Sequence, residues 1–487
     1  MLLGIFEAAR GALGSFPLAK TLGSVVIFLA LAAVVVLQNG NISQTRRKLR
    51  NLRKLGVSSS NMADQFDAKY AAPEDAEPNG PIRIKSIYIH PVKSCGAVEL
   101  DRAQLTKTGF LYDRCFAVST EVADPDTGAV SWRFVSQRTK PQMCLTRCEI
   151  WLPHGASNAS DPLLAAGGCV VLSFADPDPP TWTQRLETLL YTWDPSATPE
   201  VHLIAPLQPA TTTPTTSDRS PPELRKFGIH AREASGLDLG SVPSVSAALP
   251  KLKRFLQIPE RRGLTLMRCT PDTLARCDRN LAPLSRIGTP SVHGYTDQQP
   301  VNLNSLASVH AVSEMLPREH RPLDALRFRA NLWIAGAPAF AEEGWKRYRI
   351  HPRATGPRAP ARARAQVAPK LSVVCRTSRC TMPNVNLETG TFDADGPAEG
   401  KKKGRPQPSA TLVERRTVET GNPAALGYIG MHCVPEDQDL EEAEEQRMGL
   451  FVEVGDEIEV LETGVHLYGS TATSVLQDKG KIRIKHL

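Results

Sequence analysis

An uninterrupted apolar run near the amino terminus restricts the possible folds of this chain most. Residues 21–37 read TLGSVVIFLALAAVVVL and contain no charged side chain. As a helix they would span roughly 25 Å, slightly less than the hydrocarbon core of a bilayer, and a thin membrane or flanking residues would close that gap. Basic residues are concentrated after the run and are sparse before it. Because cytosolic flanks are enriched in Lys and Arg, we predict a single-pass signal anchor over residues 21–38, with the large carboxyl-terminal part in the cytosol.

Two other interpretations of the run are a cleaved signal peptide and a mitochondrial presequence. The run is longer than a usual signal-peptide core, no small-residue cleavage motif follows it, and a presequence would be charged and amphipathic. In residues 39–81 we expect a basic juxtamembrane segment, either an amphipathic helix near anionic headgroups or a solvated charged segment, and then a polar linker from residue 57. The basic residues are Arg46, Arg47, Lys48, Arg50, Arg53 and Lys54.

Period-two alternation of apolar and polar residues dominates the rest of the chain. It begins with IRIKSIYIHPV from Ile82 and returns in residues 116–120, 132–136 and 169–174, with turn residues between them. Helical spacing occurs in PSVSAALPKLKRFLQI and NSLASVHAVSEML, whereas residues 328–336, LFVEVGDEIEVLE and GKIRIKHL have strand patterns. The pattern predicts an α+β, β-rich fold whose short strands form barrel-like sheets.

Three segments without apolar periodicity interrupt this pattern. Residues 206–222 are rich in Thr and Pro, and we expect a disordered insertion there, between a first domain at 82–205 and a second at 223–487. The second domain contains insertions at 352–370 and 391–409, which are rich in basic residues and proline. A solvated surface loop is the simplest interpretation of both, and contact with an anionic partner is the alternative.

Charge and cysteine content exclude some classes of protein. The formal net charge of +7 is small for 487 residues and falls in local clusters, which argues against a nucleic-acid-binding surface. Ten cysteines are too few for a disulfide scaffold in a chain of this length. We therefore expect reduced cysteines in a reducing compartment.

One cysteine-containing segment has the chemistry of a ligand or nucleophile. In VVCRTSRCTMPNVNLETG, Cys375 and Cys380 are accompanied by Arg376 and Arg379. Guanidinium groups favour the thiolate form of a nearby cysteine, and a thiolate suits soft or high-valent metals. A closed zinc site is not indicated because no second ligand pair follows at a matching spacing. A buried structural cysteine is the alternative interpretation.

A second group of residues suggests an anion site. A strand ends at Pro91 and is followed by Lys93 and Ser94, and a later turn supplies Asp113 and Arg114. Two cations and a hydroxyl donor that converge from turns would bind a phosphate. Taken singly, each is also explained as a surface residue or a structural ion pair.

Together these motifs resemble the MOSC domain family. PVKSC followed by G-x-x-x-DR is similar to the β-barrel domain that precedes MOSC domains, and FRANLWIAGAPAFAEEGW, CRTSRC with NVNLETG, and VEVGDEIEV follow in the family's order. With the predicted anchor, the arrangement resembles the amidoxime-reducing members of the mitochondrial outer membrane. The resemblance implies an amino-terminal β-barrel and a mixed β-barrel of MOSC type, preceded by one transmembrane helix.

The resemblance also assigns roles to individual residues. Lys93, Ser94 and Arg114 match positions that hold the phosphate and pterin end of a molybdenum cofactor, and Arg329 and Asn331 match further cofactor contacts. Ser378 and Arg379 precede Cys380, which matches the cysteine that binds molybdenum. Residues 298–300 and 305–308, which include Gln299 and Ser305, lie where the family supplies more contacts. Three departures are Ala330 in place of a proline, a longer spacing between Cys375 and Cys380, and the two insertions.

The implied activity is reduction of N-hydroxylated compounds such as amidoximes and hydroxylamines. Electrons would come from NADH through cytochrome b5 reductase and cytochrome b5, since the chain has no haem, flavin or dinucleotide motif of its own. Arg379 would support the catalytic thiolate of Cys380. The alternatives are a non-catalytic carrier of the cofactor or of sulfur, and a membrane-surface protein that keeps the fold without the cofactor.

Overall fold

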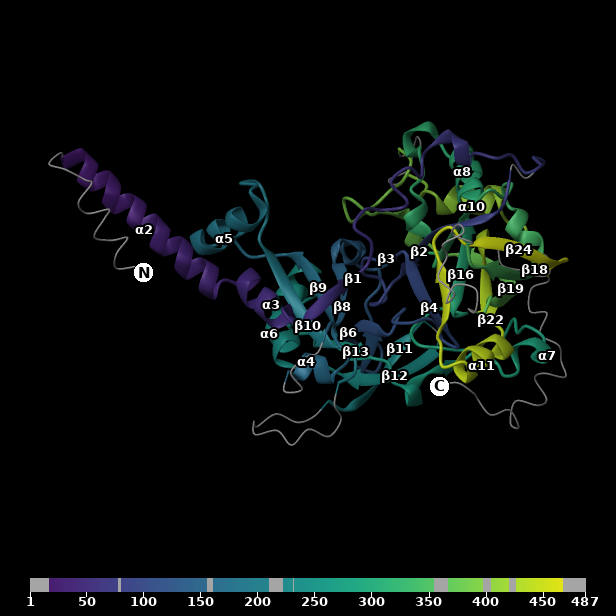
Figure 1. Cartoon of the computed structure of the whole chain (residues 1–487), viewed down its shortest axis with the longest axis horizontal. Coiled ribbons are helices and arrows are strands. Elements are labelled where there is room, and N and C mark those ends of the chain that lie inside the picture. Colours follow the sequence, from purple (N-terminus) through teal and green to yellow (C-terminus); the bar gives the residue numbers. More distant parts are fainter. Residues whose placement is uncertain are drawn as a thin grey trace.

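The computed structural model describes residues 17–77, 80–155, 161–209, 222–230, 232–353, 367–396, 404–419 and 426–466. A long helix, α2 (Pro17–Asn39), extends from a body made of sheets with a few short helices (Figure 1). The predicted β-rich α+β class and its barrels are confirmed.

Seven strands form a closed barrel at the end of the body away from α2. Their order is β17-β16-β22-β19-β18-β24-β2, and the ring closes because β2 pairs with β17. β3 (Val98–Leu100) extends the sheet beyond β2. The barrel strands are β2 (Arg83–Ile89), β16 (Val301–Ser305), β17 (Leu332–Ala335), β18 (Trp345–His351), β19 (Lys370–Arg379), β22 (Gly427–Pro435) and β24 (Glu457–Thr463).

Five more strands form a second, smaller closed barrel, in the order β11-β12-β13-β6-β7. It consists of β6 (Phe116–Ala123), β7 (Val130–Phe134), β11 (Leu224–Ile229), β12 (Arg232–Asp238) and β13 (Leu264–Arg268). Each barrel takes strands from both sides of the predicted boundary, because β2 joins the large barrel and β11–β13 join β6 and β7. The division into 82–205 and 223–487 therefore does not separate the sheets, and as a division into domains it remains a prediction.

The remaining strands form smaller sheets. β1 (Leu52–Leu55), β8 (Arg147–Pro153), β9 (Cys169–Ala175) and β10 (Glu200–Pro206) make a four-stranded antiparallel sheet, and β23 (Leu450–Glu453), β4 (Arg102–Thr106) and β5 (Gly109–Phe110) make a three-stranded one. Two-stranded pairs are β14 (Ala275–Arg276) with β15 (Val292–His293), and β20 (Val385–Asn386) with β21 (Thr391–Phe392).

Helices cover the sheets where the sequence has helical spacing. α6 (Pro243–Phe255) packs on β10 and β13, and α8 (Leu306–Met315) packs on the large barrel beside α10 (Ser409–Arg415). Further helices are α4 (Pro162–Ala165), α5 (Trp182–Thr192), α7 (Leu284–Ile287) and α11 (Asp437–Glu445). The strand expected at 328–336 is shorter than predicted, because a 3-10 turn (Ala325–Phe328) ends at Arg329 with φ of 52°.

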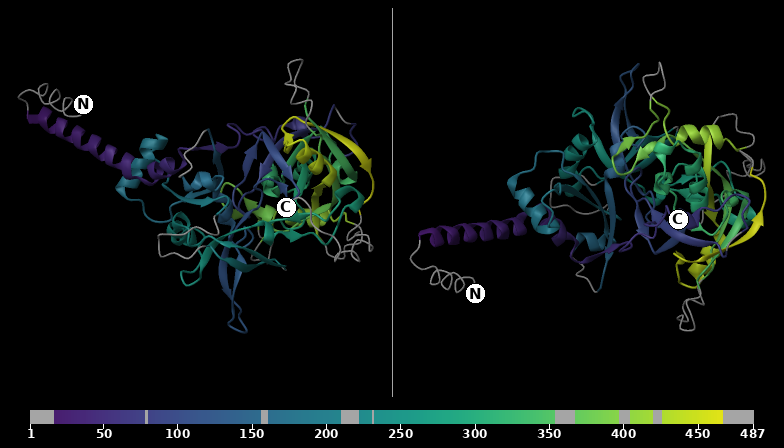
Figure 2. Two further views of the ribbon diagram at one scale, coloured as in Figure 1. Left: turned by 60° about the horizontal axis from the view of Figure 1, so that its bottom comes forward. Right: turned by 90° about the horizontal axis from the view of Figure 1, so that it is seen from above.

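The segment after α2 is packed on the body, both in the predicted juxtamembrane segment and in the predicted linker from residue 57. α3 (Asn41–Leu49) carries three of the six basic residues, and β1 pairs with β8 along Leu52–Leu55, so the juxtamembrane part is packed on the body. Met62 is also buried in the core. Both views in Figure 2 show α2 projecting from this end of the body.

Within the described residues, no single helix has the length and hydropathy needed to cross a membrane. A pair of helical segments, Leu22–Gln38 and Asn41–Leu49, meets that requirement together, with a bend of 45° between them. The central parts of the three predicted insertions (210–221, 354–366 and 397–403) and the predicted strand at 480–487 lie outside the described residues.

Candidate functional site

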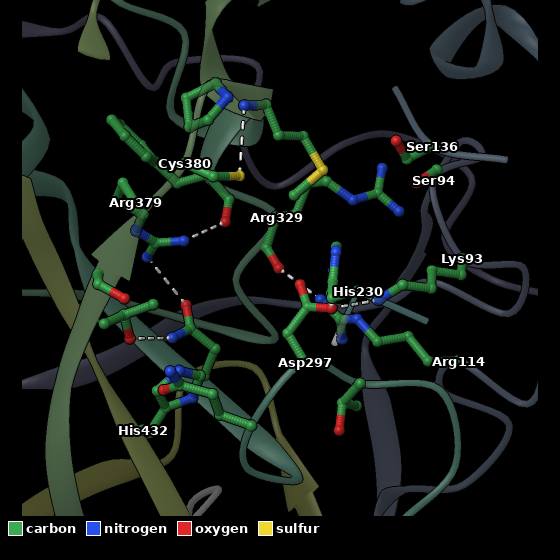
Figure 3. Close-up of a pocket in the computed structure, with 18 of the residues that line it drawn as sticks. Lys93, Ser94, Arg114, Ser136, His230, Asp297, Arg329, Arg379, Cys380 and His432 are labelled. Carbon is green, nitrogen blue, oxygen red and sulfur yellow. Dashed lines mark hydrogen bonds and ion pairs between the residues drawn. The ribbon is translucent and has the colours of Figure 1, made fainter. Parts of the chain in front are cut away.

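Most of the predicted site residues surround one cavity of about 370 Å³. Its wall combines the end of β7 and the β11–β12 turn of the small barrel with strand ends and loops of the large barrel. Figure 3 shows the side chains that meet there. Nine predicted residues line the cavity: Lys93, Ser94, Arg114, Gln299, Arg329, Asn331, Ser378, Arg379 and Cys380.

Lys93 forms one charged part of the wall. Its Nζ donates hydrogen bonds to Asp297 Oδ1 at 2.5 Å and to the backbone oxygen of Tyr295 at 2.8 Å. His230 Nε2 lies 2.9 Å from the same carboxylate oxygen (Figure 3). The side chain of Asp297 is 46% exposed, and Lys93 and His230 hold the pKa of its carboxyl well below the ordinary range. Burial lowers the pKa of Lys93.

Arg114 and Arg329 form a second group, which is rigidly held. Arg114 Nη1 donates to Asp113 Oδ2 at 2.5 Å, and its Nη2 donates to the backbone oxygen of Arg329 at 2.9 Å. Arg329 Nη1 donates to the backbone oxygen of Cys95 at 2.7 Å, whereas its buried Nη2 has no partner. Burial lowers the pKa of Arg329 to about 10, so the guanidinium remains charged at neutral pH. A buried cationic donor without a partner favours an anionic ligand.

Four residues of the cavity wall have left-handed backbone conformations that residues other than glycine seldom adopt. They are Ser94 with φ of 69°, Arg114 with 46°, His230 with 53° and Arg329 with 52°. Such conformations cost on the order of 1–3 kcal/mol each and are concentrated at functional sites. Here they turn four side chains toward one cavity from four separate loops.

The third group comes from the end of β19. Arg379 Nε and Nη1 donate to the backbone oxygens of Ile429 and Phe328, at 2.9 and 2.8 Å, and Nη2 lies 3.2 Å from Asn302 Oδ1. Burial lowers the pKa of Arg379 to about 9, which leaves it charged at neutral pH. Cys380 follows directly and is exposed, with its Sγ accepting from Met382 N at 3.4 Å. The site therefore presents an accessible thiol beside a fixed guanidinium.

The two cysteines of this segment occupy different environments. Cys375 is buried on β19, opposite His432 of β22, and does not line the cavity. Burial raises the pKa of the Cys375 thiol, which makes this thiol a poor nucleophile or ligand. Of the two, only Cys380 has its sulfur available to a ligand in the cavity.

Ser305 is the predicted residue that the structure does not bring to the cavity. It ends β16 and precedes α8, and it is fully buried with an Oγ that has no partner. Gln299 lines the cavity, but its Nε2 is engaged by the backbone oxygens of Arg279 and Asn280 at 3.0 and 3.2 Å. Their predicted contacts rested on position along the chain alone.

Sequence reasoning missed several polar residues of the wall. His432 is buried, its Nδ1 has no partner, and burial together with Arg379 lowers its pKa to about 3, so the ring is neutral. Asn302 donates from Nδ2 to Thr377 Oγ1 at 2.6 Å and lies under Arg379. No motif contains His432 or Asn302. The only signal for Asp297 was its position next to the predicted 298–300 segment. The missed polar residues are Ser136, Arg138, His230, Thr296, Asp297, Asn302, Thr377 and His432.

Comparisons with known proteins agree with the motifs. Residues 81–166 match the MOSC N-terminal beta barrel domain, and residues 290–459 match the MOSC domain. The chain is 23% identical over 326 residues to mitochondrial amidoxime-reducing component 1 of Mus musculus, which covers 66% of this chain and 71% of the relative. The Homo sapiens protein of the same name is 24% identical over 326 residues, covering 66% and 72%. The chain thus contains both MOSC domains, and the resemblance seen in the sequence is confirmed.

Proposed function

We propose that this MOSC protein binds a molybdenum cofactor and reduces N-hydroxylated compounds such as amidoximes and hydroxylamines. The observation that carries the proposal is the arrangement of one cavity, which joins the accessible thiol of Cys380 to cations contributed by both barrels. The name of the two relatives, amidoxime-reducing component, supports the substrate class.

The residues present fit such a cofactor. A pterin cofactor with a phosphate needs cations and hydrogen-bond donors at one end and a soft ligand for the metal at the other. The cations and donors for the phosphate end come from three places: the unpartnered Nη2 of Arg329, the ammonium of Lys93 and the left-handed turn at Ser94. Cys380, exposed at the cavity, supplies the soft ligand. Among the described residues of the wall, Asp297 is the one carboxylate, and Lys93 already neutralises it.

Each residue then has a defined task. The molybdenum centre, when bound, would supply the two-electron redox chemistry. Lys93, Ser94, Arg114 and Arg329 would bind and orient the anionic part, and Asn331 would hold Arg114 and the β16 backbone in place, because its Oδ1 lies 3.4 Å from Arg114 and 3.1 Å from Asn302 N. Arg379 would fix the turn that presents the Cys380 thiolate and stabilise its negative charge.

We further propose that α2, as the first part of the bent pair with α3, anchors the protein in a membrane. By analogy with the mitochondrial relatives, we place this anchor in the mitochondrial outer membrane. Its side chains support this, because Leu22, Val25, Val26, Phe28 and Leu31 are exposed and residues 21–39 of the helix carry no charge. Electrons would arrive from NADH through cytochrome b5 reductase and cytochrome b5.

The decisive experiment compares the full chain with Cys380→Ala and Cys375→Ala variants, all expressed in a host that makes molybdenum cofactor. Metal and pterin analysis and benzamidoxime reduction by a chemical electron donor are measured. We expect about one molybdenum per wild-type chain, activity in wild type and Cys375→Ala, and no activity in Cys380→Ala.

Other outcomes would redirect the proposal. A folded wild-type chain without molybdenum or pterin would refute cofactor binding. Bound cofactor without reduction of any N-hydroxylated compound would leave a carrier of the cofactor in place of an enzyme. Full activity in Cys380→Ala would show that another group binds the metal.

A further inference from the structure

Helix α5 (Trp182–Thr192) has its apolar side turned away from the protein. Trp182, Leu186 and Leu189 recur at helical spacing of four and three residues and so lie on one side of the helix, and Trp193 follows at its end. Trp182 is 65% exposed and Trp193 is 84% exposed. We call these four residues the tryptophan stripe.

The opposite side of α5 is polar and faces the body. Glu187 and Thr188 are buried there, which reverses the usual orientation of an amphipathic helix in a soluble domain. An exposed apolar stripe on a helix with a buried polar side indicates that something apolar covers the stripe.

The buried side of α5 binds the junction between α2 and α3. Glu187 Oε1 accepts from Ser43 N at 3.1 Å, and Tyr191 OH lies 2.9 Å from Ser43 Oγ. The guanidinium of Arg46 lies 4.3 Å from the centre of the Tyr191 ring. At Gly40, an added Cβ would collide with the Glu187 carboxylate. The position of α5 is thus fixed at the point where α2 leaves the body, and Figures 1 and 2 both show the two helices side by side.

The charges of the same region select the partner. Residues 41–55, which include α3 and β1, contain six Lys and Arg residues and no acidic residue. Arg46, Arg50 and Arg147 line a groove with Trp151 next to this junction, and Lys54 in the same groove pairs with Glu149 at 2.7 Å. Tryptophan favours the boundary between headgroups and acyl chains, and clustered cations favour anionic headgroups.

We propose that the tryptophan stripe of α5 lies in the headgroup–acyl boundary of an anionic bilayer and orients the two barrels against the membrane. The proposal rests on the membrane anchoring by α2 proposed above. An anchor alone would attach the body to the membrane at one point, whereas a second contact through α5 would set the orientation of the body and its cavity relative to the bilayer.

Tryptophan quenching in reconstituted vesicles tests the contact. The full chain is placed in vesicles of phosphatidylcholine and phosphatidylserine, with or without bromine atoms on the acyl carbons near the headgroups. α2 contains no tryptophan, so the anchor itself gives no signal, and two of the six tryptophans of the chain belong to the stripe. We expect brominated lipid to quench up to roughly a third of the emission. Quenching should be lost in Trp182→Phe/Trp193→Phe and retained in the control Trp132→Phe.

Flotation of the vesicles separates the two levels of the proposal. If the chain floats with the vesicles but brominated lipid leaves its emission unchanged, the anchor holds and the stripe does not touch the bilayer. The stripe would then cover another surface, such as a partner protein. If the chain does not float at all, both the anchor and the α5 contact are wrong.

Discussion

Arg379 Nη1 donates a hydrogen bond to the backbone oxygen of Phe328, 2.8 Å away, and thereby connects two segments that lie 51 residues apart in the sequence. Phe328 precedes Arg329, whose side chain binds the backbone of Cys95, and Arg379 precedes Cys380. One arginine thus ties the turn with the exposed thiol to the turn with the unpartnered guanidinium. The two ends of the proposed cofactor site are fixed relative to one another through this hydrogen bond.

Arg379→Lys tests that connection. A lysine ammonium cannot reach the backbone oxygens of Ile429 and Phe328 together with Asn302, because it lacks the planar fork of guanidinium. We expect reductase activity to fall roughly 10- to 100-fold through misplacement of Cys380, with cofactor content reduced. Activity and molybdenum per chain are compared with Arg405→Lys, at an exposed ion pair with Glu414. Unchanged activity in Arg379→Lys would refute the positioning role.

Gly430→Ala tests the support beneath Arg379. Gly430 has φ of 80°, and an added Cβ would collide with the carboxamide of Asn304 and lie 2.8 Å from the Leu303 backbone oxygen. We expect a loss of about 2 kcal/mol or more in the free energy of unfolding, together with weaker cofactor retention. Urea denaturation measures the loss, and Gly344→Ala serves as the control because its Cβ would meet open space. Equal stability of both variants would contradict the prediction.

Glu342→Gln tests a buried carboxyl under α8. Glu342 is fully buried, Ser308 Oγ donates to its Oε1 at 2.7 Å, and burial raises its pKa to about 7 from the ordinary 4.5. In the unfolded chain this group ionises above pH 4.5, whereas in the folded chain it stays protonated until about pH 7. Its contribution to stability is therefore present in full below pH 4.5 and is lost as the pH rises to 7.

The glutamine side chain cannot ionise. The free energy of unfolding of the variant should therefore rise relative to that of wild type between pH 5 and 7, by at most about 3 kcal/mol, and the difference should then stay constant. Chemical denaturation at pH 5, 6, 7 and 8 measures the difference. Glu260→Gln, at a side chain that is 66% exposed, should show no such trend. A difference that does not change with pH would show that Glu342 does not titrate in this range.

Lys107→Met tests an ion pair buried between the two halves of the sequence. Lys107 Nζ donates to the Asp437 carboxylate and to the backbone oxygens of Ile287 and Thr289 at 3.0 and 2.9 Å. Removing the cation leaves Asp437 charged and buried, which typically costs about 3–5 kcal/mol. We expect a corresponding decrease in stability in thermal and urea denaturation. Lys107→Met/Asp437→Asn should recover part of it, and a single variant as stable as wild type would contradict the prediction.

The period-two patterns predicted much of the fold because a strand with one buried face records that burial in its own residues. β2, β6, β7 and β9 lie where alternation or apolar runs placed them, within a few residues. Closure of the large barrel was not predictable in this way. It depends on the pairing of β2 with β17, in which Leu332 lies opposite Ile87. No local pattern encodes a pairing between strands so far apart in the sequence.

In the site too, some residues were predictable from local motifs and others were brought in only by the tertiary structure. Short motifs, whose chemistry can be recognised from neighbouring residues, contain Lys93, Arg114, Arg329 and Cys380. The structure brings these four residues to one cavity. His230 and Asp297 carry no such motif. They meet Lys93 because a left-handed turn between β11 and β12 faces the loop before β16.

The sequence by itself therefore determined the apolar amino-terminal helix, the β-rich class, the MOSC motifs and the choice of Cys380 as the candidate ligand. These depend on composition and on spacing within a few residues. The tertiary structure decided how strands from distant segments close two barrels, which polar groups remain without partners in the cavity, and which side of α5 faces outward. Those features depend on contacts between residues far apart in the chain, and the free energy of such contacts is fixed only when the whole fold has formed.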